Sequence, residues 1–234
     1  TTTKDGITLT HWWLKAYDPE GTIFFLHGNA QNISAHIQSV YWLTDAGFNV
    51  FMFEYRGYAD PQVPLSLEKT FGDIDVARNY VMDELSPNQP FFMLGQSLGA
   101  AIGIYSMATA SQQQNICAGI FEAPFTSYRE IAQEKLGSFW LTWPFQYPLS
   151  WLVTDDYSAE EAITEIDGIP VLIIQSDEDT VVPYHHGKTV YEQANEPREF
   201  YSVSGPHIST YNEDKHREKL LKYLYTHTCP AKDS

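Results

Sequence analysis

The chain has 234 residues, of which 43% are hydrophobic and 19% charged, a composition that can bury a sizeable core and excludes disordered, collagen-like and low-complexity classes. Its 14 Lys and Arg against 30 Asp and Glu give a net charge of −16. So acidic a chain lacks the clustered cations that a phosphate backbone requires, and we expect no nucleic acid among its partners. The length fits one α/β domain spanning residues 1–234.

The chain begins with three threonines and no initiator Met, from which we expect that an upstream segment has been removed. This leaves a lost signal or anchor, and the cellular compartment, open. The uncharged stretch 136–154 is long enough to cross a bilayer but contains prolines and hydroxyl side chains, so we predict no transmembrane span. Two cysteines are too few for a disulfide framework, and we interpret Cys117 as a core thiol and Cys229 as a tail thiol.

Short β-rich runs alternate with longer helical patterns along the whole chain. Continuous apolar runs are typical of strands covered on both faces, and apolar residues at spacings of three and four are typical of amphipathic helices. In chain order, the patterns predict strands at 7–14, 22–26, 49–53, 91–94, 117–121, 171–175 and 199–203, and helices at 32–46, 66–85, 98–110, 185–195 and 213–227. This alternation predicts an α/β fold with a mostly parallel central sheet flanked by helices.

One interval of about forty residues, 126–167, interrupts this alternation. Because excursions of this length are usually functional, we predict a short aromatic lid here and not a second domain. Its candidate substrate-binding residues are the aromatic side chains Trp140, Trp143, Phe145 and Trp151. Two interpretations stay open: these aromatics form an apolar acyl site or interfacial surface, or they only fix the lid to the sheet.

The clearest chemical signal is the pentapeptide Gly-Gln-Ser-Leu-Gly at 95–99, between a predicted strand and a helix of small residues. A serine on such a tight turn is held in a strained backbone conformation, and the two glycines remove Cβ atoms that would crowd it. The turn also points the N-terminus of the helix at the serine oxygen. We therefore predict that Ser97 is a nucleophile.

A serine hydroxyl is a weak nucleophile and requires a base, which in turn requires an orienting acid. His207 follows the last predicted strand, and both Asp177 and Asp179 follow the strand at 171–175. Since the carboxyl ends of parallel strands meet at one edge of a sheet, we expect the serine, the histidine and one of these acids to lie together.

Acyl transfer also requires hydrogen-bond donors for the developing oxyanion, each worth about 3–4 kcal/mol in known cases. We expect the backbone N–H groups of Leu98 and Asn29 to supply them, with a plain turn as the alternative for Asn29. The pair His185 and His186 suggests a metal site, but no carboxylate or cysteine stands at ligand spacing beside it. We therefore predict that the pair begins a helix and that the chain holds no metal.

Together these residues resemble the α/β-hydrolase superfamily of serine hydrolases over essentially the whole chain. Within it, the chain resembles the small single-domain esterase and thioesterase group that includes the protein depalmitoylases. The segments that carry the resemblance are DGITL at 5–9, FLHGNAQN at 25–32, YRGY at 55–58, GQSLG at 95–99 and DTVVP at 179–183. The resemblance implies the α/β-hydrolase fold, Asp179 as the acid before Val-Pro, and His207 as the histidine of a late Gly-x-His. Two features depart from the family: Ala59 replaces a usual glycine, and a first strand before Asp5 is missing.

The sequence thus predicts a serine hydrolase that cleaves carboxylic esters or thioesters of short-to-medium acyl chains through an acyl-enzyme, without a cofactor. The expected partner is a small-molecule or lipid-like ester, with peripheral membrane contact left open. Because nine carboxylates and no cation lie between Lys135 and Lys188, we expect anionic acyl groups to be poor substrates. Two alternatives remain: a peptidase or amidase, and a catalytically silent binding protein of the same fold, against which the intact Ser, Asp, His order argues.

Overall fold

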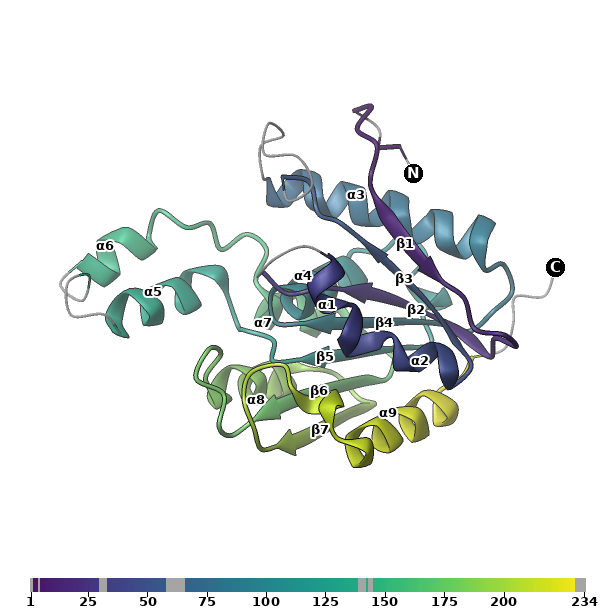
Figure 1. Ribbon diagram of the computed structural model, residues 1–234. Coiled ribbons are helices and arrows are strands. Elements are labelled where there is room, and N and C mark those ends of the chain that lie inside the picture. The colour runs from purple at the N-terminus through teal and green to yellow at the C-terminus, as the bar shows by residue number, and fades with distance from the viewer. Residues whose placement is uncertain are drawn as a thin grey trace.

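A seven-stranded sheet with the order β1-β3-β2-β4-β5-β6-β7 forms the centre of the molecule (Figure 1). The computed structural model describes residues 2–3, 5–29, 33–57, 66–138, 142 and 145–229. Only β1 pairs in antiparallel fashion, with β3, and all other pairings are parallel. The strands are β1 (His11–Leu14), β2 (Gly21–Leu26), β3 (Phe48–Phe53), β4 (Phe91–Gln96), β5 (Ala118–Glu122), β6 (Val171–Ser176) and β7 (Arg198–Val203). The prediction of a mostly parallel sheet is confirmed.

Helices cover both faces of this sheet, and alternate residues of each strand pack against opposite layers. On β2, for example, Phe24 and Leu26 belong to one buried cluster, and Ile23 and Phe25 to the other. The first layer contains α3 (Leu67–Tyr80), η1 (Val81–Leu85), α4 (Leu98–Ala108), α7 (Ala159–Ala162), η4 (Ile163–Glu165) and α8 (Tyr184–Gln193). The second contains α1 (Ile33–Val40), α2 (Trp42–Asp45) and α9 (Asp214–Thr226), which lie in front of the sheet in Figure 1. Two short 3₁₀ turns, η2 (Gln113–Asn115) and η5 (Thr210–Asn212), complete the elements outside the insertion.

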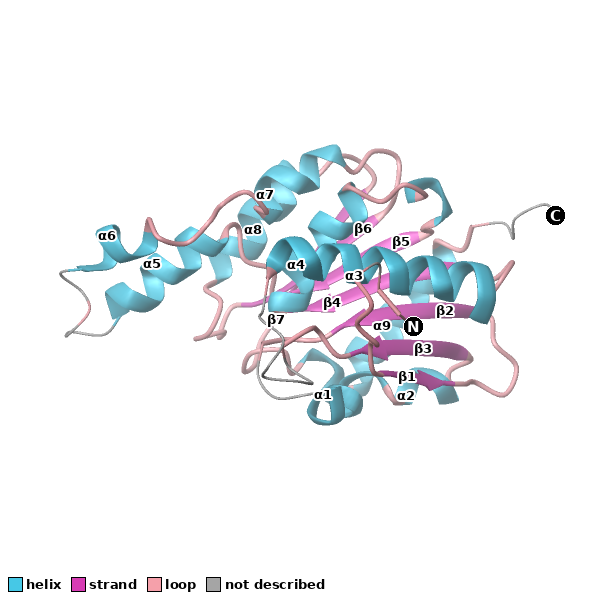
Figure 2. Ribbon diagram, turned by 90° about the horizontal axis from the view of Figure 1, so that it is seen from above, coloured by secondary structure: helices cyan, strands magenta, loops and turns pink. Residues whose placement is uncertain are grey.

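The insertion between β5 and β6 projects from the end of the sheet at which the parallel strands have their carboxyl ends. Its helices α5 (Tyr128–Ser138) and α6 (Gln146–Ser150) lie side by side beyond the body of the molecule in both ribbon views (Figures 1 and 2). None of the residues of α5 is fully buried, whereas Ala159 and Ala162 of α7 return the chain to the core. Within the described ranges, no helix combines the length and the apolar character that crossing a bilayer requires.

Cys117 and Cys229 form a disulfide, with their Cα atoms 5.1 Å apart. The prediction of two separate thiols is therefore wrong. Cys117 immediately precedes β5, and the segment after α9 returns to the same end of that strand, although 112 positions separate the two cysteines. Composition alone does not reveal so long-range a contact. By closing a loop of this length, the disulfide restricts the unfolded chain and so favours the folded one.

Candidate active site

Ser97 occupies the sharp turn between β4 and α4, at the carboxyl end of the sheet. Its backbone angles are φ 56° and ψ −117°, in a region that residues with a side chain rarely adopt. The flanking glycines make the turn feasible, because a Cβ on Gly99 would collide with the carbonyl oxygen of Leu26 and one on Gly95 with that of Gly99. The strain at Ser97 is thus maintained by the close packing of α4 against the strands, as expected at a functional turn.

A chain of hydrogen bonds joins three of the residues that the sequence singled out. The Nε2 atom of His207 lies 2.9 Å from Ser97 Oγ, and its Nδ1 atom lies 2.6 Å from Asp179 Oδ2. The second carboxylate oxygen of Asp179 accepts the N–H groups of Val181 at 2.7 Å and Val182 at 2.9 Å. Three residues from the ends of three different strands therefore meet at one edge, in the geometry of a nucleophile, a base and an orienting acid.

Asp179 is held as a carboxylate by its partners. Burial by itself would raise the pKa of Asp179, but the hydrogen bonds from His207 and from the amides of Val181 and Val182 outweigh it, so the pKa lies below its usual value. Its side chain is 1% exposed and that of His207 is 16% exposed. Asp177, the competing acid, is exposed two residues earlier. Of the two acids, Asp179 is the one that contacts the histidine.

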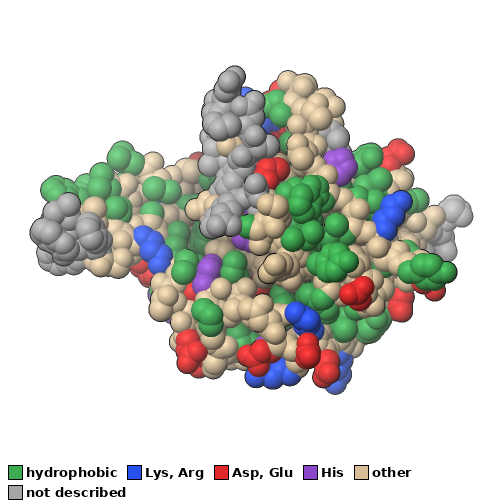
Figure 3. Space-filling view, viewed as in Figure 1, with side chains coloured by type: hydrophobic (Ala, Val, Ile, Leu, Met, Phe, Trp, Pro, Cys, Tyr) green, Lys and Arg blue, Asp and Glu red, His purple; other side chains and the backbone are tan. Residues whose placement is uncertain are grey.

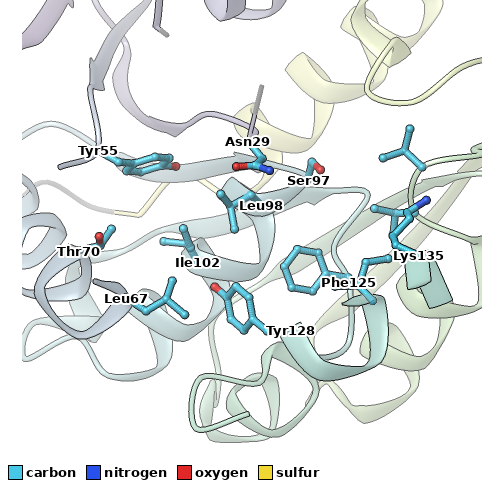
Figure 4. Close-up of a pocket in the computed structure, with 13 residues that line it drawn as sticks. Asn29, Tyr55, Leu67, Thr70, Ser97, Leu98, Ile102, Phe125, Tyr128 and Lys135 are labelled. Atoms are coloured by element: carbon cyan, nitrogen blue, oxygen red, sulfur yellow. The ribbon is translucent and has the colours of Figure 1, made fainter. Parts of the chain in front are cut away.

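Leu98 and Asn29 lie next to Ser97, on the same side of it in Figure 4, and all three line one cavity. Leu98 is the first residue of α4, where backbone N–H groups have no acceptor within the helix. Asn29 lies in the loop after β2. Two residues that follow β3 anchor this loop. Tyr55 donates its hydroxyl proton to the His27 carbonyl oxygen at 3.0 Å, and the Glu54 carboxylate accepts the backbone N–H of Ile33 at 2.9 Å. These anchors were not expected from the sequence, although an acid and a tyrosine directly after a buried strand are a usable signal.

The cavity beside Ser97 has a volume of about 420 Å³ and mostly apolar walls. It is lined by Asn29, Tyr55, Leu67, Thr70, Ser97, Leu98, Ile102, Phe125, Tyr128, Ile131, Lys135, Val181 and Val182. In Figure 4, Leu67 and Thr70 lie to one side of Ser97, and Phe125 and Lys135 lie to the other. Lys135 is the single charged side chain among these described lining residues, and it donates to the carbonyl oxygen of Thr180 at 3.2 Å.

The insertion contributes to this cavity through residues other than those expected. Of the four candidate aromatics, Trp140 and Trp143 lie outside the described residues, while Phe145 and Trp151 are 56% and 73% exposed and do not line the cavity. The reason is that α6 packs on α5 and not over Ser97. Instead, α5 itself presents Tyr128, Ile131 and Lys135, whose spacing places them on one helix face.

The expectation that anionic acyl groups are disfavoured also loses its basis. It rested on the number of carboxylates along the insertion, but none of them is among the described residues that line the cavity. The charge that does lie there is the ammonium group of Lys135. A count of charges along the sequence therefore misrepresents the electrostatics of this cavity, because none of the nine counted carboxylates is among the described residues that line it.

A buried carboxyl group that was not expected from the sequence connects the loop of Ser97 with the loop of His207. Glu122 ends β5, and its Oε2 atom accepts the side-chain amide of Gln96 at 2.5 Å while its Oε1 atom accepts the N–H of Thr210 at 3.2 Å. Gln96 directly precedes Ser97, and Thr210 follows His207 by three residues. Burial raises the pKa of Glu122, and the hydrogen bonds from Thr210 and Gln96 offset only part of that effect.

The sheet, the strained serine turn and the residues at its edge define an α/β hydrolase. Residues 17–161 match the family described as "Serine aminopeptidase, S33", and the chain belongs to this family of the α/β-hydrolase superfamily. The resemblance and the fold inferred from the sequence are thereby confirmed.

Relatives and solved structures agree with this placement. The chain is 32% identical over 240 residues to the protein YfhR of Escherichia coli K12, covering 98% of this chain and 80% of the relative. It is 28% identical over 200 residues to the lysophosphatidylserine lipase ABHD12 of Danio rerio, covering 78% of this chain and 50% of the relative. Among solved structures, the Pyrococcus furiosus esterase Pf2001 superposes with a TM-score of 0.76 at 21% identity, covering 97% of this chain and 90% of the esterase, a likeness of fold.

Glu122→Gln removes the titrating group but keeps an acceptor for the Thr210 amide. Because a raised pKa means that the folded protein binds this proton more tightly than the unfolded chain, the wild type should lose stability relative to the variant as pH rises above about 4.3, up to the raised pKa of Glu122. The slope of this difference cannot exceed about 1.4 kcal/mol per pH unit. Urea unfolding of both proteins at several pH values between about 5 and 7 measures the difference between their free energies of unfolding. If the free energies of unfolding of the two proteins change in parallel with pH, Glu122 is ionised throughout this pH range.

Proposed function

We propose that this protein is a serine hydrolase that cleaves carboxylic esters or thioesters of short-to-medium acyl chains through an acyl-enzyme. The observation that carries the proposal is the hydrogen-bonded series Ser97, His207, Asp179 at the mouth of an apolar cavity. Such a cavity with a few convergent polar groups is the usual form of a small-molecule site.

In the proposed mechanism, Ser97 Oγ attacks the acyl carbonyl carbon while His207 Nε2 takes the hydroxyl proton. Asp179 accepts the Nδ1–H of the ring, which fixes the tautomer and stabilises the imidazolium ion. The backbone N–H groups of Leu98 and Asn29 stabilise the oxyanion of the tetrahedral intermediate. His207 then protonates the leaving alkoxide or thiolate. A water molecule, deprotonated by the same nitrogen, attacks the acyl-enzyme and releases the carboxylic acid and Ser97.

The second candidate is an aminopeptidase or other amidase, which the description of the matching family favours. An aminopeptidase must bind the ammonium group of its substrate, and a nearby carboxylate is the natural partner for such a cation. The described walls of the cavity contain no carboxylate and place Lys135 there instead, which would repel an ammonium group. Assays of aminoacyl anilides beside acyl esters separate the two candidates. A catalytically silent binding protein is a weaker alternative, because it would not need the serine, histidine and acid in hydrogen-bond contact.

The exposed apolar surface of the insertion supports a lipid-like ester as the substrate. Five exposed apolar side chains follow one another on and beside α6: Phe145, Tyr147, Leu149, Trp151 and Leu152. Hydrophobic side chains are visible on this projecting part of the molecule in Figure 3. Contiguous exposed apolar surface of this kind is typical of interaction sites, so we propose that α6 contacts the surface of a membrane or micelle from which a substrate enters.

Ser97→Ala should abolish covalent labelling by a fluorophosphonate probe and lower kcat for ester hydrolysis by at least about 10⁴-fold, because no other group can form the acyl-enzyme. Ser204→Ala serves as the matched control, since Ser204 is an exposed serine in the same loop as His207. We expect the control to label and turn over like the wild type. Labelling of Ser97→Ala at the wild-type rate would refute the assignment of the nucleophile.

Asp179→Asn should lower kcat by about 10⁴-fold, because an amide favours the wrong tautomer of His207. Asp177→Asn makes the same chemical change two residues away on an exposed side chain and should leave kcat within about twofold of the wild type. Steady-state kinetics on one ester, with thermal unfolding as a test of folding, compares the two. A larger loss in Asp177→Asn would transfer the acid role to that residue.

The acyl chain is proposed to extend from Ser97 toward Leu67 and Thr70. Each buried CH₂ group contributes about 0.8 kcal/mol, or roughly fourfold in kcat/KM, until the cavity is full. In a series of p-nitrophenyl esters, activity should therefore rise to a maximum and then fall. Leu67→Trp should move the maximum to shorter chains, whereas Leu221→Trp, a half-buried position on α9, should not. An unchanged maximum in Leu67→Trp would place the acyl chain elsewhere.

A further inference from the structure

Two histidines and two glutamates meet where the insertion joins the body of the molecule. His185 and His186 lie in the first turn of α8, and Glu130 and Glu134 lie one turn apart on α5. One carboxylate bridges the pair: Glu134 Oε1 is 3.0 Å from His185 Nε2, and Glu134 Oε2 is 3.1 Å from His186 Nε2. A carboxylate oxygen of Glu130 and one ring nitrogen of each histidine lie within 4.8 Å of one another.

These separations are close to what a tetrahedral metal site requires. Around Zn²⁺, with bonds of about 2.0–2.2 Å to nitrogen and oxygen, neighbouring ligand atoms lie roughly 3.4 Å apart. The two contacts of Glu134 are already near that value, and the stacked rings of His185 and His186, with centroids 4.3 Å apart, both direct Nε2 at the Glu134 carboxylate. Binding of one ion by all four residues requires the flexible Glu130 and Glu134 side chains to bring their carboxylates together beside the two ring nitrogens.

The surroundings of His186 also fit a ligand. Its side chain is fully buried, and its Nδ1 atom lies 2.8 Å from the hydroxyl of Thr126, which in turn donates to Glu130. In the structure, Nδ1 also accepts the backbone N–H of Thr126 at 3.3 Å, so binding of Nε2 to a metal requires the ring proton to move to Nδ1, which then donates it to the Thr126 hydroxyl oxygen. A hydrogen bond to the second ring nitrogen is the usual device that orients a metal-bound histidine.

We propose that Glu130, Glu134, His185 and His186 form a binding site for one Zn²⁺ ion, which joins α5 of the insertion to α8 of the body. Two imidazoles and two carboxylates are a suitable ligand set for Zn²⁺. The site is structural, because all four side chains lie outside the lining of the Ser97 cavity.

Zinc binding would affect the Ser97 cavity because α5 has one face toward the cavity and another toward α8. Tyr128, Ile131 and Lys135 face the cavity, and the i, i+4 pair Glu130 and Glu134 faces α8. An ion held by both helices would restrict the movement of α5 relative to the body, and therefore the movement of one wall of the cavity. Because the proposal concerns metal binding alone, it does not depend on the proposed hydrolase activity.

Zinc binding is measured by titrating the chelator-treated, desalted protein with ZnCl₂ against a chromophoric competitor. We expect one ion per chain, and His185→Ala and Glu134→Gln should each weaken binding by at least about tenfold. His227→Ala and Glu192→Gln, a histidine and a glutamate outside the cluster, should retain wild-type affinity, and so should His207→Ala. Absence of binding, or equal affinity in His185→Ala and the wild type, would overturn the proposal. Since the His185 side chain is 53% exposed, its removal should leave the fold intact, which circular dichroism verifies.

Two further readouts are independent of affinity. Co²⁺ in place of Zn²⁺ should give the intense visible absorption of a tetrahedral site in the wild type and lose it in His185→Ala. Trypsin should cleave after Arg129 and Lys135, the two cationic residues of the insertion, more slowly with Zn²⁺ than without it. The rate should not respond to Zn²⁺ in His185→Ala. A weak, octahedral-type Co²⁺ spectrum, or cleavage of the wild type that ignores Zn²⁺, would contradict a site that joins the two helices.

Discussion

The in-register parallel pairing of β4, β5 and β6 is the constraint on which the rest of the site depends. Gln96 pairs with Glu122, and Glu122 pairs with Ile174, so these strands end at one level of the sheet. The residues that follow them begin their loops side by side, which allows side chains far apart in the sequence to meet within hydrogen-bond distance. A slip of one residue would reverse the face of every side chain and separate the serine from its partners.

Buried carboxyl groups support this edge, and their environments give them different properties. Asp179 faces an imidazole and two amides, and its pKa is lowered in spite of burial. Glu54 likewise has a lowered pKa, because the bonds from His27 and the Ile33 amide outweigh its burial. The described hydrogen-bond donors to Glu122, which come from Gln96 and Thr210, are neutral, and burial raises its pKa. A hydrogen bond from a histidine, and not depth or the number of donors, separates the two carboxyl groups with a lowered pKa from Glu122.

Features of the structure could be predicted from the sequence when the residues that produce them lie close together along the chain. Local patterns gave the strands, most helices and Ser97, because apolar periodicity and a glycine-flanked turn are encoded within a few residues. The positions of Asp179 and His207 followed from strand order and family resemblance. The disulfide of Cys117 and the meeting of His185 with Glu134 could not be predicted, since each joins distant segments without a local signature. The helix α3 ends in a π-helical turn, η1, for which the apolar spacing gave no indication.

The insertion shapes one wall of the Ser97 cavity, in a fold that supports many reactions. The body holds the serine, the histidine and the acid, whereas α5 adds three residues to the cavity wall, one of which is the cation Lys135. The same helix has no fully buried residue, so hydrophobic packing alone holds it weakly. Its position relative to Ser97 therefore depends on polar contacts, those of Lys135 with the Thr180 carbonyl and of Glu134 with the two histidines. Any agent that strengthens or breaks these contacts acts on the shape of the cavity, and the contact of Glu134 with the histidines does so from outside the cavity lining.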